Sequence, residues 1–170
     1  MNLILCGMMG AGKTTVGMKI AEAVGLRWYD TDEVIVEKHG EISEIFKRYG
    51  EEYFRKLETE TVAVLSKEDG LVLSVGGGLV LKEENVKLLK SNGKIVFLRA
   101  GLETLEKRLR ADNTRPLLRT DRECLRERLT RLLEERAPVY ERVADCIVDV
   151  DGKNPEAIAA EIITLTKEEK

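Results

Sequence analysis

Residues 7–14, Gly-Met-Met-Gly-Ala-Gly-Lys-Thr, have the spacing of a phosphate-binding loop. Glycines allow the backbone to wrap closely around a phosphate with its N–H groups turned inward, and a following helix adds the positive end of its dipole. Lys13 would reach the β- and γ-phosphates of a nucleotide, and the Thr14 hydroxyl would ligate Mg²⁺. A chance glycine turn is the alternative, but the strand-like residues before the motif and the helical pattern after it argue against a chance match.

Two aspartates, Asp30 and Asp32, follow a second short apolar run at residues 28–29. The carboxyl ends of strands are where open α/β sheets bind ligands. The two carboxylates could therefore hold a hydrated Mg²⁺ and contact the hydroxyl group of a phosphoryl acceptor. Aspartate is also a frequent helix N-cap, and Asp32 precedes an expected helix at residues 33–38, so a structural role for Asp32 remains open.

Arg55 and Glu58 are three residues apart on one face of an expected helix, where the acid can orient the guanidinium. A surface ion pair is the alternative interpretation of these two residues. Gly76, Gly77 and Gly78 directly follow the apolar run at residues 71–75. Three glycines at the end of a strand leave backbone N–H groups accessible to a ligand, although a flexible turn would have the same composition.

We expect most arginines in the second half of the chain to be balanced by acids on solvated helix faces. Two arginines differ from these in position. Arg115 precedes a proline in the polar segment at residues 111–121, which is expected to form a mobile flap. Arg136 is followed by Ala137 and Pro138, and we expect it at the end of a helix that stops near residue 135.

The elements that must position these residues alternate along the chain. Strand-like runs occur at residues 3–6, 28–29, 71–75, 95–98 and 147–150. Helix-length segments separate them, which predicts an α/β fold with a parallel sheet covered on both faces. Two connections are longer than one crossover helix requires, at residues 31–69 and 101–143. Within them we expect helices at residues 33–38, 42–48 and 51–67, a helix through Arg110, and the helix that stops near residue 135.

Length and composition restrict the function further. The 170 residues predict one domain, and 43% hydrophobic residues suffice for a core. The net charge of −3 argues against a nucleic-acid or membrane surface, and no apolar run is long enough to span a bilayer. We expect a cytoplasmic monomer that binds small molecules. Three scattered cysteines predict free thiols rather than disulfides or a metal site.

Six motifs together, and in this order, resemble the shikimate kinase family. They are the loop at residues 7–14, Asp30-Thr31-Asp32, Phe54-Arg55 with Glu58, the three glycines 76–78, Arg115-Pro116-Leu117-Leu118, and Arg136-Ala137-Pro138-x-Tyr140. The resemblance covers nearly the whole chain. It implies a P-loop kinase fold of the nucleoside-monophosphate-kinase type, with a five-stranded parallel sheet in the order 2-3-1-4-5. In this single kinase domain, residues 1–170, the substrate-binding region would be about residues 31–60 and the lid about residues 111–121.

The resemblance also implies an activity: ATP and shikimate would give ADP and shikimate 3-phosphate, a step toward aromatic amino acids. Lys13, Asp32 and Arg115 would be catalytic. The implied ATP-binding residues are Gly10, Ala11, Gly12, Lys13, Thr14, Thr15, Arg108, Arg115 and Pro155, with Arg108 and Pro155 on either side of adenine. The implied shikimate-binding residues are Asp32, Arg55, Gly76, Gly77, Gly78 and Arg136. Mg²⁺ would be bound directly by Thr14 and through water by Asp30 and Asp32.

Two other functions fit part of the pattern. A gluconate kinase of the same architecture also binds a hydroxylated carboxylate, so the arginines alone do not exclude it; the three glycines with Asp32 favour shikimate. A nucleotide-dependent switch without catalysis would need the phosphate-binding loop alone. The presence of Lys13, Asp30, Asp32 and Arg115 together argues against a switch.

Overall fold

The computed structural model describes residues 1–112 and 122–167, with the side chains of residues 122–124 left out. The expected flap therefore lies almost entirely outside the described residues, and so does Arg115. In chain order the elements are β1 (Asn2–Cys6), α1 (Lys13–Val24), β2 (Arg27–Asp30), α2 (Thr31–His39), α3 (Ile42–Leu65), β3 (Leu71–Ser74), the short 3₁₀ helix η1 (Leu79–Leu81), α4 (Glu83–Lys90), β4 (Gly93–Arg99), α5 (Leu102–Ala111), α6 (Arg122–Val143), β5 (Cys146–Asp149) and α7 (Pro155–Lys167).

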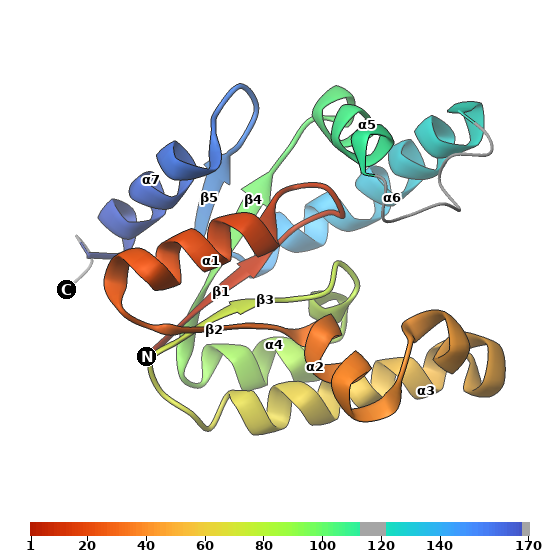
Figure 1. Ribbon diagram of the computed structural model, residues 1–170, viewed down its shortest axis with the longest axis horizontal. Helices are drawn as coiled ribbons and strands as arrows, with labels where there is room; N and C mark the ends of the chain where they lie inside the picture. The colour runs from red at the N-terminus through yellow and green to blue at the C-terminus, as the bar shows by residue number, and fades with distance from the viewer. Residues whose placement is uncertain (113–121, 168–170) are drawn as a thin grey trace.

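The five strands form one parallel sheet in the order β2-β3-β1-β4-β5, as the resemblance implied. All five expected strands are present. Figure 1 shows α1 and α7 on one face of this sheet, and α4, α6 and the C-terminal half of α3 on the other. β1, β3 and β4 are the inner strands, and their apolar side chains are almost completely buried. Because helices cover both faces of the sheet, these strands consist of continuous rather than alternating apolar residues.

The register of the strands brings distant parts of the chain to one edge of the sheet. Leu5 of β1 aligns with Ser74 of β3, and Ser74 aligns with Asp30 of β2. The loop after β1, the start of α2 and the glycines after β3 therefore leave the sheet side by side. This edge is the one at which the sequence motifs were expected to meet.

The first long connection contains the expected helices. α2 covers residues 31–39, and α3 joins the two helices expected at residues 42–48 and 51–67. The junction is Gly50, whose φ of 83° interrupts the helix because this left-handed conformation cannot continue an α-helix. α3 thus consists of two parts, which together pack against α2, α4 and η1 (Figure 1).

The second long connection corrects one expectation. The helix expected to stop near residue 135 continues to Val143, with Pro138 inside it, so Arg136 lies within α6 rather than at its end. Proline removes one backbone hydrogen bond and normally ends a helix. Here the turn beyond it is held by tertiary packing, because Tyr140 and Val143 are buried in the main core.

The described helices give no candidate for a membrane-spanning segment, since none combines sufficient length with sufficient apolar character.

Gly17 of α1 shows how closely this helix packs on the sheet. A Cβ atom at Gly17 would lie 2.6 Å from Trp28 Nε1 and 2.7 Å from Ser74 Oγ, two atoms that are hydrogen-bonded to each other at 3.0 Å. We expect Gly17→Ala to lower the unfolding midpoint by about 3 to 6 °C, because the overlap with these side chains outweighs the better helix propensity of alanine. Thermal unfolding followed by circular dichroism measures the shift.

The control for Gly17→Ala is Met18→Ala in the same helix, where the side chain is 52% exposed and the midpoint should change by less than about 3 °C. A midpoint for Gly17→Ala equal to or above that of the parent would contradict this account of the packing.

Candidate active site

A pocket of about 370 Å³ opens at the carboxyl edge of the sheet, bordered by the loop after β1, the start of α2, the glycines after β3, and helices α5 and α6. Most of the residues predicted for the site line it: Gly10, Gly12, Lys13, Thr14, Thr15, Asp30, Asp32, Gly76, Gly77, Arg108 and Arg136. Ala11, Arg55, Gly78 and Pro155 do not line this pocket. The fold thus gathers residues from five separate segments into one cavity.

The loop at residues 7–14 has the backbone that a phosphate site requires. Gly10 and Gly12 have positive φ values of 83° and 95°, which favour glycine at both positions. Helix α1 begins at Lys13. The Lys13 Nζ donates to the carbonyl oxygens of Gly7 at 2.8 Å and Met8 at 3.0 Å. The ammonium group is therefore held within the loop, next to the N-terminus of the helix. Both features attract an anion.

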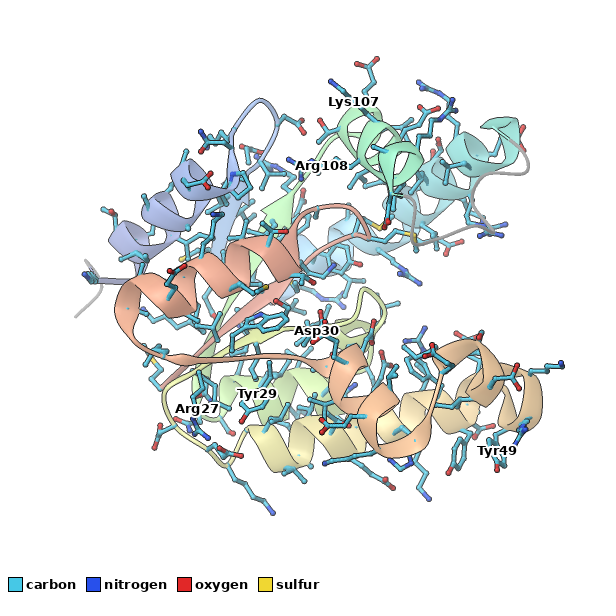
Figure 2. All side chains as sticks on the ribbon, in the orientation of Figure 1. Arg27, Tyr29, Asp30, Tyr49, Lys107 and Arg108 are labelled. Atoms are coloured by element: carbon cyan, nitrogen blue, oxygen red, sulfur yellow. The ribbon has the colours of Figure 1, made fainter. Side chains whose placement is uncertain are left out.

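Arg108 lies against the same loop from α5. Its Nη1 donates to the carbonyl oxygens of Gly10 at 3.2 Å and Ala11 at 3.0 Å. Figure 2 shows Arg108 and Asp30 on opposite sides of the loop. Pro155, the expected partner of Arg108 at adenine, begins α7 and does not line the pocket with it. Their pairing around a base stays a prediction.

Asp30 connects the phosphate loop to the start of α2. One carboxylate oxygen accepts the hydroxyl hydrogen bond of Thr14 at 3.0 Å, and the other accepts the backbone N–H of Asp32 at 2.9 Å. Asp30 is therefore the N-cap of α2. The structural role considered for Asp32 belongs to Asp30 instead, and Asp32 lies in the first turn of the helix with its side chain lining the pocket.

The three glycines form a backbone surface against which charged side chains pack. A Cβ atom at Gly76 would lie 2.9 Å from Asp32 Oδ1 and 3.0 Å from Glu58 Oε1. At Gly77 it would lie 3.1 Å from Arg136 Nη1, and at Gly78 2.5 Å from Arg55 Nη1. A side chain at Gly76 or Gly78 would thus require charged groups of the site to move, and one at Gly77 would make a tight contact with Arg136. We call residues 76–78 the glycine loop.

Arg55 and Glu58 form an ion pair in which the acid is buried and the arginine is partly exposed. Their side-chain atoms are 2.7 Å apart, and the Glu58 side chain is 1% exposed. Burial raises the pKa of Glu58, and nearby Asp32 adds to the rise, whereas Arg55 and Arg136 oppose it. Arg55 also contacts Glu51 at 3.2 Å, so acids flank the guanidinium on two sides. The pair fixes Arg55 beside Gly78, next to the pocket.

Three hydroxyl groups that received no role from the sequence hold the end of β3. Ser74 Oγ donates to the carbonyl oxygen of Lys13 at 2.8 Å, and Thr31 Oγ1 accepts the N–H of Gly76 at 3.1 Å. The Tyr140 hydroxyl donates to the carbonyl oxygen of Gly77 at 2.5 Å. Thr31 and Tyr140 stood inside motifs quoted from the sequence, but only their burial and their partners in the fold reveal these contacts.

Within the described ranges, no group of three or more His, Cys, Asp or Glu side chains could hold a metal ion. The side-chain oxygen atoms that line the pocket include the Thr14 hydroxyl and the carboxylates of Asp30 and Asp32.

Comparison with known proteins relates the chain to one family. Residues 9–167 match the family described as shikimate kinase. The chain is 42% identical to a shikimate kinase of Thermodesulfovibrio yellowstonii, with 95% of this chain and 92% of that one covered. It is 43% identical to a shikimate kinase of Caldicellulosiruptor bescii, with 99% and 98% covered. A solved structure of shikimate kinase from Acinetobacter baumannii in complex with shikimate superimposes with a TM-score of 0.91 at 36% identity, covering 99% of this chain and 94% of that one.

The buried carboxylate of Glu58 predicts a pH effect on stability. Its pKa is raised in the folded protein, so between the unfolded and folded pKa values the folded state binds more protons, and the free energy of unfolding falls as the pH rises. Glu58→Gln removes this titration. We therefore expect the variant to gain stability relative to the parent as the pH is raised from about 4 to about 7. Urea unfolding at several pH values measures the difference.

Glu60→Gln is the control for Glu58→Gln, since Glu60 lies on the same helix with its side chain 57% exposed. Its stability relative to the parent should stay nearly constant with pH. A constant difference for Glu58→Gln as well would show that the burial of Glu58 does not shift its titration.

Proposed function

The chain belongs to the shikimate kinase family, and from this membership we propose that it transfers the terminal phosphoryl group of ATP to the 3-hydroxyl group of shikimate. The products are ADP and shikimate 3-phosphate, and the reaction is a step of the shikimate pathway toward aromatic amino acids. The observation that carries this proposal is that one pocket is lined both by the phosphate loop and by Asp32, Gly77 and Arg136. A nucleotide and a small acid could therefore meet in it.

On the nucleotide side, we infer that the backbone N–H groups of residues 10–15 and the Lys13 ammonium group hold the β- and γ-phosphates. Phosphoryl transfer requires positioning and charge neutralisation more than covalent chemistry. A fixed positive charge at the helix N-terminus serves both purposes. Lys13 is held in place by the carbonyl oxygens of Gly7 and Met8, so it needs little rearrangement to neutralise charge on the transferred group.

The oxygen atoms beside the loop fit Mg²⁺, which prefers oxygen ligands and usually keeps several waters while bound to substrate phosphates. We propose that Thr14 binds the ion directly and that Asp30 and Asp32 bind it through water. The Thr14–Asp30 contact at 3.0 Å supports this set, because a hydroxyl and a carboxylate already lie together there. Bound Mg²⁺ would supply charge neutralisation on the β- and γ-phosphates.

On the acceptor side, we propose that Arg55 and Arg136 bind the carboxylate of shikimate and that the glycine loop contacts its ring. Guanidinium groups suit a carboxylate because two parallel N–H groups can pair with both oxygens. Asp32 would contact the reacting hydroxyl group. This role is supported by its position in the pocket that the phosphate loop also lines and by its closeness to Gly76.

Arg115 and most of the proposed lid lie outside the described residues. Residues 1–170 would form a single kinase domain, with the substrate region at about residues 31–60. The lid at about residues 111–121 would bring Arg115 to the ATP phosphates, and Arg108 with Pro155 would hold adenine. The monomeric state and the cytoplasmic location also stay predictions.

Lys13→Ala should reduce kcat by about 10² to 10³, because it removes the fixed positive charge beside the transferred group. The control is Lys19→Ala in the same helix, where the lysine pairs with Glu156 outside the pocket and turnover should change less than about twofold.

A coupled assay of ADP release with shikimate, and in parallel with gluconate, measures both variants and the parent. Near-parental turnover of a folded Lys13→Ala protein would remove Lys13 from the site, and preferred turnover of gluconate would replace the proposed acceptor.

Arg136→Ala should weaken shikimate binding selectively. Removing one partner of a partly desolvated carboxylate typically costs about 2 to 5 kcal/mol, which corresponds to roughly 30-fold or more in Kd. The Kd for ADP with Mg²⁺ should change little, because the nucleotide is held by other residues. Arg136→Lys should recover only part of the loss, since an ammonium group keeps the charge but not the paired N–H groups. Titration calorimetry with each ligand measures these constants.

Arg142→Ala is the matched control for Arg136→Ala, because it removes an exposed arginine from the same helix and changes the net charge equally. It should leave both constants within about twofold. Parental shikimate affinity in folded Arg136→Ala would remove Arg136 from the site and weaken the proposed substrate.

A further inference from the structure

Tyr140 is a buried polar group that the proposed function does not use. Its side chain is 0% exposed, at the C-terminal side of Pro138 in α6. The ring packs against Phe97 of β4, with the ring centres 5.1 Å apart, and the hydroxyl group lies 3.9 Å from Met8 Sδ in the phosphate loop. A phenylalanine would fill the same space, so packing alone does not explain why this position carries a hydroxyl group.

The hydroxyl group has two partners that belong to the acceptor side of the pocket. It donates to the carbonyl oxygen of Gly77 at 2.5 Å, and the Arg136 guanidinium lies against the same glycine, close enough to lower the pKa of the phenol. A guanidinium only donates and a carbonyl oxygen only accepts, so a phenol, which does both, can connect them. Tyr140 and Arg136 are four residues apart in α6, the spacing that brings two side chains together on one helix face.

We propose that Tyr140 is a positioning residue for the acid-binding half of the site: its hydroxyl group ties the Arg136 guanidinium to the carbonyl oxygen of Gly77 and so fixes the direction in which Arg136 presents its remaining N–H groups. This inference rests on the proposed role of Arg136 toward the shikimate carboxylate. Tyr140 itself does not line the pocket, so it acts through Arg136 and the glycine loop rather than by touching the substrate.

The geometry around Gly77 explains why the three groups form a unit. A Cβ atom at Gly77 would lie 3.1 Å from Arg136 Nη1 and 3.4 Å from the Tyr140 hydroxyl oxygen. Both side chains therefore rest on the backbone of the same glycine. Burial raises the pKa of Tyr140 to about 12, although Arg136 opposes the rise. The phenol consequently keeps its proton at neutral pH and continues to donate to Gly77.

Tyr140→Phe removes one oxygen atom and tests the proposal directly. We expect Kd and KM for shikimate to rise about tenfold, since a hydrogen bond to a charged group is lost, while Kd for ADP with Mg²⁺ and kcat at saturating shikimate change less than about threefold. The matched control is Tyr29→Phe, whose hydroxyl group lies beside Arg27 and away from Asp30 (Figure 2) and should leave all constants within about twofold.

A double-mutant cycle with Arg136→Lys separates positioning from packing. If Tyr140 acts by orienting the guanidinium, Tyr140→Phe should change the shikimate Kd less than about twofold once the guanidinium is absent. If Tyr140 has only a structural role, Tyr140→Phe should raise the shikimate Kd by the same factor in the parent and in the Arg136→Lys protein. It should then also change the Kd values for shikimate and ADP to a similar extent. Either of those results, or parental shikimate affinity in folded Tyr140→Phe, would overturn the proposal. Shikimate binding by the parent protein distinguishes the two failures. If the parent does not bind shikimate, the proposed function is wrong; if only the Tyr140→Phe result differs from expectation, the role of Tyr140 alone is wrong.

If Tyr140→Phe does not fold, replacement of Tyr140 by 3,5-difluorotyrosine keeps the ring and the oxygen and lowers the phenol pKa. The ionisable groups that act on the phenol are Arg136 on its own helix, Cys6 of β1 and Arg55 of α3. An ionised phenol cannot donate to Gly77 and would neutralise Arg136. The shikimate Kd of this variant should therefore rise between about pH 7 and about pH 10 more steeply than that of the parent. Parallel pH profiles would overturn the proposal.

Discussion

The close approach of charged side chains to the backbone of residues 76–78 is the constraint on which the rest of the site depends. Asp32, Arg55 and Arg136 come from three different helices, and each lies within 3.1 Å of the place that a Cβ atom on one of these glycines would take. A side chain at Gly76 or Gly78 would force a charged group to move, and one at Gly77 would crowd Arg136. The parallel register places the loop beside the start of α2, and Gly50 separates the two parts of α3, the second of which carries Arg55.

The charged groups beside this loop are buried to different extents, so the free energy that their attraction contributes also differs. Glu58 is the most buried of them, and its raised pKa shows that burial outweighs its hydrogen bond to Arg55. Taking a carboxylate and a guanidinium out of water costs free energy that their attraction only partly returns. A buried pair of this kind is therefore weak evidence for stability. Its effect here is to hold one arginine in a fixed direction beside Gly78, which is a requirement for recognising a carboxylate.

The nucleotide and acceptor halves of the pocket rest on different elements that share the end of β3. Ser74 joins that strand to the first residue of α1, whereas Thr31 and Tyr140 join the next residues to α2 and α6. Asp30 links the halves a second time, through Thr14 on one side and the start of α2 on the other. In the site that we propose, substitutions should therefore affect one ligand selectively, although both proposed subsites rest on the end of β3.

The sequence by itself determined the features that local pattern controls. The glycine spacing at residues 7–14 defines the phosphate loop, the apolar runs locate all five strands, and the break between the two parts of α3 falls near Gly50 as expected. Only the tertiary structure decided that Asp30 rather than Asp32 caps α2, that α6 continues through Pro138, and that Tyr140 bonds to Gly77, 63 residues away. The physical reason is that propensity and periodicity act over a few residues, whereas burial and register join segments that are distant in the chain.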